Sequence, residues 1–163
     1  MENARERDLK LGARRLPEVK LASAPGGLPA PLRPSGRVSP VLVLVDGAEC
    51  DACRAWLRRL AAASAEIAEW DGRVIVVVPA SPDQAVRIAA DAAKHFTLLA
   101  DPDHALAARL GISPPALVIA DQYGEIHHAA TAGDAHALPE PADIGDWLRY
   151  LAIQCPECQG EAL

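Results

Sequence analysis

The chain has 163 residues and a formal net charge of −6, and 50% of its residues are apolar but only 4% aromatic. This length fits one domain of ordinary size, whose core must be filled mostly by Ala, Val and Leu. The net negative charge, which no cluster of basic residues offsets, argues against nucleic acid as a partner. No apolar run approaches the roughly 18 residues that span a bilayer, so we expect no membrane insertion.

The beginning of the chain is expected to lie outside the globular domain. Residues 1–15 are highly charged and lack the apolar segment of a signal peptide, which predicts a frayed arm and a cytoplasmic protein. The domain itself is expected to span 16–154, with 155–163 as a short C-terminal tail. Its first part, up to Pro40, is rich in Pro and Gly and favours short edge strands over a helix. The candidate edge strands are Glu18–Leu21 and Ala30–Arg33.

The most informative stretch begins with Val41–Val45, five consecutive apolar and mostly β-branched residues. Such a run predicts a strand that is buried on both faces. Cys50 and Cys53 follow after a short polar break, and apolar residues then recur at helical spacing over Trp56–Leu60. Cys50 is therefore expected at a helix N-terminus, where unpaired N–H groups and the helix dipole favour a thiolate. A dithiol in this position can attack a disulfide and then resolve the intermediate.

The remaining chain alternates between apolar runs and helical periods. Strands are predicted at Val74–Val78, at Phe96–Leu99 and in a hairpin over 112–130 with its turn at Asp121–Gly124. Helices are predicted from the cysteines to about Trp70, from Pro82 to about His95, over His104–Leu110 with Asp103 as N-cap, and over Ala142–Ile153. This alternation predicts an α/β protein whose sheet is parallel in the middle and antiparallel at an edge.

Three phrases of the sequence carry a resemblance to a known superfamily. They are Glu49–Arg54 with its Cys-x-x-Cys spacing, Leu99–Asp103 before a short helix, and Pro115–Ile126 at the hairpin. With the order of elements, they resemble the thioredoxin-like redoxin superfamily of thiol-disulfide oxidoreductases and peroxiredoxin-like, AhpC/TSA-type proteins. The resemblance covers roughly residues 16–153. It implies a thioredoxin-like fold, in which a central mixed sheet is flanked by helices on both faces.

The resemblance also gives Pro115 a role. In that superfamily a cis proline opens the first strand of the hairpin and faces the cysteines, and Pro115 occupies the matching position. A cis X-Pro bond presents the preceding backbone to an extended substrate, which can then pair with it as a strand. The alternative interpretation is that Pro114 and Pro115 mark only a turn before a strand.

The chain departs from the superfamily pattern at three positions. Glu49 stands where thioredoxins have a Trp before the first cysteine, and Leu44 stands where they have a buried acid. A general base must then be Asp46, Glu49, solvent or nothing. Gly47 stands where typical peroxiredoxins have a Thr or Ser that hydrogen-bonds the peroxide, which weakens the peroxidase interpretation. Glu49 and Asp51 also bring negative charge to Cys50 and oppose the helix dipole by raising the pKa of its thiol.

A second Cys-x-x-Cys pair, Cys155 and Cys158, follows the last predicted helix. In a thioredoxin-like fold this helix runs away from the active-site end, so twelve helical residues place Cys155 about 18 Å down its axis. A zinc site made from all four cysteines of one chain is therefore not expected. Three interpretations stay open for the tail: a zinc site shared between two chains, a second redox pair, or an incidental exposed pair.

The sequence thus predicts a cytoplasmic thiol-disulfide oxidoreductase. Cys50 is the expected attacking thiolate, Cys53 the resolving thiol, and Pro115 the residue that shapes the substrate groove. Expected partners are protein disulfides and a thiol electron donor, in a monomer or homodimer, with no cofactor or metal except zinc at the tail. The alternatives are a thiol peroxidase, in which Cys50 is oxidised to a sulfenic acid that condenses with Cys53, and a non-catalytic thioredoxin-fold module.

Overall fold

A computed structural model describes residues 15–47, 51–89, 94–131 and 138–153 of the chain. The strands in these residues are β1 (Lys20–Ala24), β2 (Pro29–Pro31), β3 (Ser39–Leu44), β4 (Gly72–Val78), β5 (Thr97–Ala100), β6 (Ala116–Ala120) and β7 (Ile126–Thr131). The helices are α1 (Asp51–Ala62), α2 (Ser64–Glu69), α3 (Pro82–Ala89), α4 (Ala105–Leu110) and α5 (Pro141–Ile153).

The strands form one mixed sheet in the order β2-β1-β5-β4-β3-β6-β7. The three inner strands β5, β4 and β3 are parallel, while β6 and β7 continue the sheet antiparallel on one side and β1 and β2 on the other. The predicted sheet, parallel in its middle and antiparallel at an edge, is therefore confirmed. Pro29 and Pro31 fit β2 because a proline, which has no N–H to donate, is tolerated at the outer strand of a sheet.

The predicted central strand is confirmed as β3. It pairs with β4 through Val41↔Val74 and with β6 through Leu44↔Ala116, and its apolar residues are buried on both faces. Alternation of side chains along the strand sends Val41 and Val43 into one hydrophobic cluster, and Leu42 and Leu44 into the other. β3 therefore belongs to both halves of the core.

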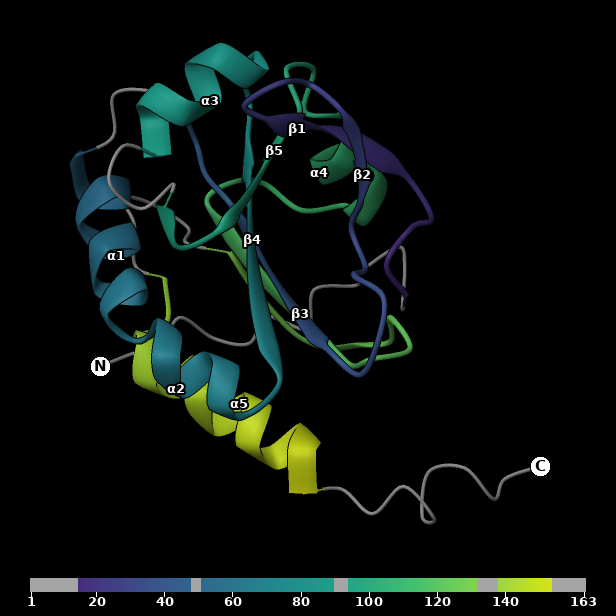
Figure 1. The fold of residues 1–163 in the computed structure, drawn as a ribbon, viewed down its shortest axis with the longest axis vertical. Coiled ribbons are helices and arrows are strands. Elements are labelled where there is room, and N and C mark those ends of the chain that lie inside the picture. Colours follow the sequence, from purple (N-terminus) through teal and green to yellow (C-terminus); the bar gives the residue numbers. More distant parts are fainter. Residues whose placement is uncertain (1–14, 48–50, 90–93, 132–137, 154–163) are drawn as a thin grey trace.

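Helices cover both faces of the sheet, as expected. Side chains of α1, α2, α3 and α5 pack into the cluster of Val41 and Val43, whereas α4 packs on the opposite face with Leu16 and Leu32. Figure 1 shows the first group of helices along one side of the sheet and α4 behind it. This arrangement is the thioredoxin-like one that the resemblance implies.

The single helix predicted from the cysteines to about Trp70 is instead two helices, separated at Ala63. The second of them, α2, packs where α5 and the start of β4 meet. A Cβ atom at Gly72 would lie 2.5 Å from Leu148 Cδ1 and 2.7 Å from Ile67 Cγ2. Glycine at this position therefore lets the two helices approach β4 closely.

The N-terminus of α4 is capped by a different acid from the predicted Asp103. Asp101 is buried, and its two carboxylate oxygens accept the backbone N–H groups of Ala105 at 3.1 Å and Leu106 at 3.0 Å. Asp103 is exposed. Asp101, two residues before Asp103, reaches the helix because His104, which lies between Asp101 and Ala105, takes a left-handed backbone conformation.

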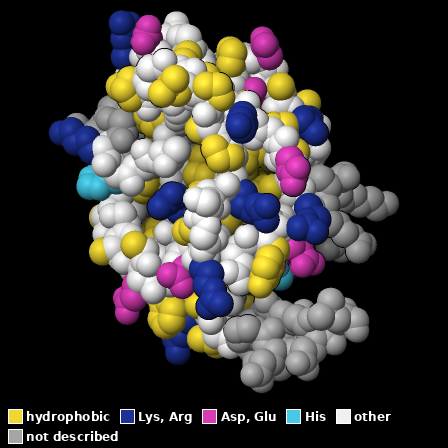
Figure 2. Space-filling model, turned by 45° about the vertical axis from the view of Figure 1, so that its right-hand side comes forward, with side chains coloured by type: hydrophobic (Ala, Val, Ile, Leu, Met, Phe, Trp, Pro, Cys, Tyr) yellow, Lys and Arg dark blue, Asp and Glu magenta, His cyan; other side chains and the backbone are white. Residues whose placement is uncertain are grey.

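The surface carries charges of both signs. Figure 2 shows Lys and Arg side chains across the middle of one face, with acidic side chains toward its margins and apolar side chains above. Among the described residues, no helix is long and apolar enough to cross a membrane.

We predict that Asp101→Ala lowers the free energy of unfolding by about 1–3 kcal/mol, because the part-buried N–H of Ala105 and the buried N–H of Leu106 lose their acceptor. Asp103→Ala is the matched control and should change it by less than about 0.5 kcal/mol, as an exposed substitution does. Urea unfolding of both variants measures the difference. An equal loss in the two variants would contradict the assignment of the cap to Asp101.

Candidate functional site

The predicted dithiol motif follows the carboxyl end of β3 in the sequence. β3 ends at Leu44, and α1 begins at Asp51, the residue that directly follows Cys50. Cys50 itself is outside the described residues. Cys53 is the third residue of α1, and only 5% of its surface is exposed. The second cysteine of the motif is therefore near the start of the helix, as the spacing predicted, and the structure shows that it is largely covered.

Pro115 lies at the same end of the sheet. It is buried and directly precedes Ala116, which pairs with Leu44 at the end of β3. The Pro114–Pro115 peptide bond is cis, in agreement with the prediction. Among the described residues the Ala24–Pro25 bond, at the turn between β1 and β2, is also cis. The end of β3, the start of α1 and the start of β6 thus bring Cys53 and Pro115 to one edge of the sheet.

The charged groups around this edge are mostly solvated. Arg54 and Asp51 lie one turn apart at 4.0 Å, but the Asp51 side chain is almost fully exposed, so their attraction is weak. Leu44, at the position of the buried acid of thioredoxins, is itself buried, and Asp46 is exposed. Neither residue therefore places a buried carboxylate at the end of β3 that could act as a base.

The two buried carboxylates of the described residues serve other parts of the fold. Both oxygens of Asp101 accept N–H groups of α4. Asp121 lies in the β6–β7 turn, at the opposite end of the sheet from the start of α1. Of the two acids proposed as a base from the sequence, Asp46 is described and exposed, and Glu49 is outside the described residues.

Two contacts hold α1 against the segment that leads into α5. The indole N–H of the buried Trp56 donates to the carbonyl oxygen of Pro139 at 2.9 Å. One turn later, Arg59 forms an ion pair with Glu140 at 3.5 Å. Helical spacing predicts Trp56 on the helix, but it does not predict its hydrogen-bond acceptor, which is 83 residues away in the sequence. These contacts fix the helix that carries Cys53.

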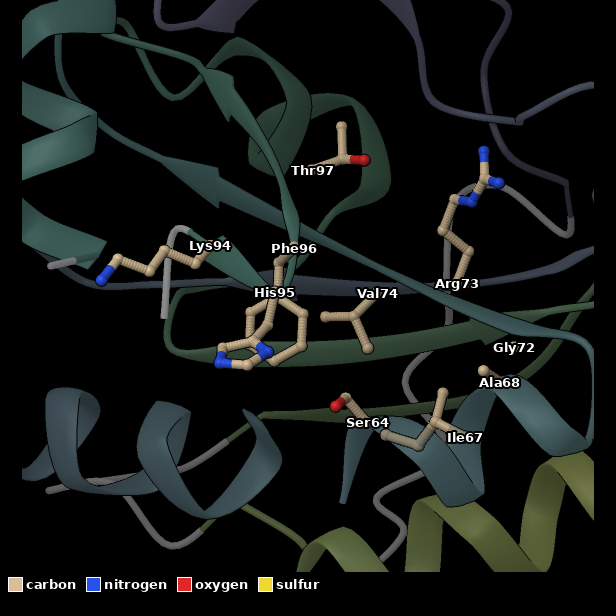
Figure 3. Close-up of a pocket in the computed structure, with 10 residues that line it drawn as sticks. All are labelled: Ser64, Ile67, Ala68, Gly72, Arg73, Val74, Lys94, His95, Phe96 and Thr97. Atoms are coloured by element: carbon tan, nitrogen blue, oxygen red, sulfur yellow. The ribbon is translucent and has the colours of Figure 1, made fainter. Parts of the chain in front are cut away.

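A cavity of about 430 Å³ lies elsewhere, between α2, the start of β4 and the segment before β5 (Figure 3). Ser64, Ile67, Val74 and His95 converge on it, while the charged ends of Lys94 and Arg73 point away from one another. Because it is at the amino ends of β4 and β5, this cavity is not part of the dithiol site, which is at the carboxyl end of β3.

The second cysteine pair, Cys155 and Cys158, is outside the described residues. The last described helix, α5, ends at Ile153. In Figure 1 this end of α5 lies away from the start of α1, at the other end of the molecule. The direction of α5 thus agrees with the prediction that the four cysteines of one chain do not form a single site.

The sequence pattern of the AhpC/TSA family matches residues 35–129, which include β3, the dithiol motif, Pro115 and most of the hairpin. The chain belongs to the AhpC/TSA family. No curated protein matches the chain at a significant level.

Solved structures place this AhpC/TSA-family chain among thioredoxin-like folds. Peroxiredoxin Q from Xanthomonas campestris superposes with a TM-score of 0.70 at 16% sequence identity, over 82% of this chain and 91% of that one. AhpC from Enterococcus faecalis gives 0.70 at 17% identity, over 84% and 89%. A thioredoxin-like protein from Porphyromonas gingivalis gives 0.62 at 23% identity, over 84% and 91%. At these identities the likeness establishes the fold.

We predict that brief iodoacetamide treatment of the reduced protein alkylates Cys50 several-fold faster than Cys53. Cys53 is largely covered by the fold. A cysteine that directly precedes a helix in the sequence is expected to be the more reactive one, because the helix dipole favours its thiolate. Mass-spectrometric peptide mapping measures both rates in one sample, and the same mapping after unfolding in urea is the control for intrinsic reactivity. Preferential labelling of Cys53 in the folded protein would reverse the two roles.

Proposed function

We propose that the protein is a thiol-disulfide oxidoreductase that uses Cys50 as the attacking thiolate and Cys53 as the resolving thiol. The observation that carries the proposal is the position of Cys53, which is covered in the first turn of a helix that follows the buried strand β3. Pro115 directly precedes Ala116, which pairs with Leu44 at the end of β3. In the proposed mechanism Pro115 shapes the groove in which a substrate chain lies. Membership of the AhpC/TSA family supports a redox function at the coarser level.

The proposed reaction has two exchange steps. The Cys50 thiolate attacks one sulfur of a substrate disulfide, forms a mixed disulfide and releases the other substrate sulfur as a thiolate. Cys53 then loses its proton and attacks the sulfur of Cys50, which releases the second substrate thiol and leaves a Cys50–Cys53 disulfide. The substrate has gained two electrons, and a thiol donor must reduce the protein before another cycle. We propose protein disulfides as the substrates and the cytoplasm as the compartment.

A second candidate function is thiol peroxidase activity, and family membership is the observation that favours it. Cys50 would then attack a hydroperoxide, become a sulfenic acid and release an alcohol or water. Cys53 would condense with the sulfenic acid to give a disulfide and one water. Gly47 argues against efficient turnover by this route, because it supplies no hydroxyl three residues before Cys50. A non-catalytic module is the third interpretation, and inactivity in both reactions would favour it.

We predict that the purified protein reduces insulin disulfides and that Cys50→Ser abolishes this activity, whereas hydroperoxide turnover is weak. Two assays on one sample, insulin reduction with dithiothreitol as donor and peroxide consumption, measure the ratio. Cys53→Ser should accumulate the mixed disulfide with substrate, since the resolving thiol is missing. Efficient peroxide reduction at low substrate concentration that Cys50→Ser removes would favour the peroxidase.

Gly47 offers a matched variant for the same pair of assays. No described atom lies within 4 Å of a Cβ placed on Gly47, so a serine side chain has room there, but φ at Gly47 is +158°, a backbone conformation that a serine adopts only with strain. Gly47→Ser should raise peroxide turnover and leave insulin reduction within about twofold, if the missing hydroxyl limits the peroxidase reaction. An unchanged peroxide rate would show that the limit lies elsewhere.

We also propose that the Cys155–Cys158 tail is separate from the chemistry at Cys50. Deletion of 155–163 removes no described strand and no residue of α5, so the thermal midpoint should change by less than about 2 °C. Insulin reduction should also persist. If the tail forms a zinc site between two chains, zinc content and dimer mass should disappear together in the truncated protein. A metal-free monomer before truncation would exclude that zinc site.

A further inference from the structure

The return strand of the hairpin contains a β-bulge that places an extra residue at His127. Ile119 of β6 pairs with His128, whereas the next residue, Ala120, pairs with Ile126. His127 therefore has no opposite residue in the ladder, and such a bulge re-aims its side chain. The two neighbouring histidines separate: the ring of His128 stacks on Trp147 with centroids 4.8 Å apart, while Nε2 of His127 lies 3.0 Å from Oδ2 of Asp121.

The Asp121 carboxylate is oriented by the turn itself. Its Oδ1 accepts the backbone N–H groups of Tyr123 at 2.9 Å and Glu125 at 3.0 Å. These bonds leave Oδ2 as the oxygen presented to His127. The Asp121 side chain is 12% exposed and that of His127 is 23% exposed, so both lie at a fixed, partly buried position. The guanidinium of Arg15 donates to the carbonyl oxygen of Tyr123 at 2.7 Å, and the Arg33 side chain lies beside Gly124 of the same turn.

Glu125 completes a group of three metal-binding side chains. One ligand atom from each of Asp121, Glu125 and His127 lies within 4.8 Å of the other two. Ligands at 2.0–2.2 Å from one ion and at right angles to each other are about 3 Å apart. The 3.0 Å separation between His127 Nε2 and Asp121 Oδ2 therefore suits two neighbouring positions around a cation as well as it suits a hydrogen bond. Glu125 is exposed, which leaves room for water as further ligands.

We propose that Asp121, Glu125 and His127 bind a divalent first-row transition-metal cation at the β6–β7 turn. One imidazole and two carboxylates are the ligands that ions such as Mn²⁺ and Zn²⁺ take, and the two carboxylates neutralise the charge of the ion. The ion takes the place of the direct contact between His127 Nε2 and Asp121 Oδ2. The site lies at the opposite end of the sheet from the start of α1, so it does not depend on the proposed dithiol function.

Titration of the chelator-treated, full-length protein with Mn²⁺ alone tests the site, by calorimetry and by the electron paramagnetic resonance of free Mn²⁺. Mn²⁺ is the chosen probe because it prefers oxygen and imidazole ligands, whereas thiolates at the cysteine pairs favour zinc. We expect one Mn²⁺ per chain. Glu125→Gln and His127→Ala should each weaken binding at least about tenfold, as the loss of a ligand does.

Matched controls separate this site from other binding. His128→Ala removes the neighbouring histidine, whose ring faces Trp147, and should leave Mn²⁺ affinity within about twofold. Deletion of 155–163 should also leave it unchanged, which excludes the tail. Glu125→Gln keeps the backbone groups that Glu125 contributes to the turn, so it tests the site without loss of the hairpin.

Absence of saturable Mn²⁺ binding up to millimolar concentration would overturn the proposal. Binding that survives both Glu125→Gln and His127→Ala, or that disappears with the tail, would overturn it as well. Should His127→Ala not fold, selective broadening by Mn²⁺ of one histidine ring signal in the wild-type spectrum, lost in Glu125→Gln, supports the site. Equal broadening of all histidine signals contradicts it.

Discussion

Burial of β3 on both faces is the constraint on which the rest of the structure depends. A strand with β4 on one side, β6 on the other and apolar clusters above and below exposes no edge and no face to water. Only a continuous apolar run satisfies such a position, and Val41–Val45 is one. The polar segment after it must therefore leave the sheet at the carboxyl end of β3. That exit sets where the dithiol motif and α1 begin.

The same constraint divides the molecule into two ends with different chemistry. The carboxyl end of β3 gathers Cys53 and Pro115, because β6 runs antiparallel to β3 and starts where β3 stops. Its other end carries the turn after β6, with the histidine and carboxylates of our proposed cation site. Contacts from Trp56 and Arg59 to the segment before α5 hold the helix at the first end.

Two of the three departures of the chain from its superfamily, at Leu44 and Gly47, concern proton transfer and peroxide binding, not the framework. Leu44 and Gly47 keep the strand and its exit but supply neither a buried acid nor a hydroxyl. These departures leave the fold and the family unchanged. The choice between disulfide and peroxide chemistry depends on a few side chains near Cys50. Disulfide exchange needs only an accessible thiolate and a resolving thiol, so it tolerates these losses better than peroxide reduction does.

The sequence by itself determined the central strands, the helical turn of Cys53 and the hairpin that Pro115 opens, because local apolar runs and helix-start signals encode them. Tertiary structure alone decided the break at Ala63, the bulge at His127, and the capping of α4 by Asp101 in place of Asp103. Trp56 bonding to a carbonyl 83 residues away belongs to the same group. Each of these features depends on how separate elements pack, or on a backbone conformation that no sequence pattern predicts.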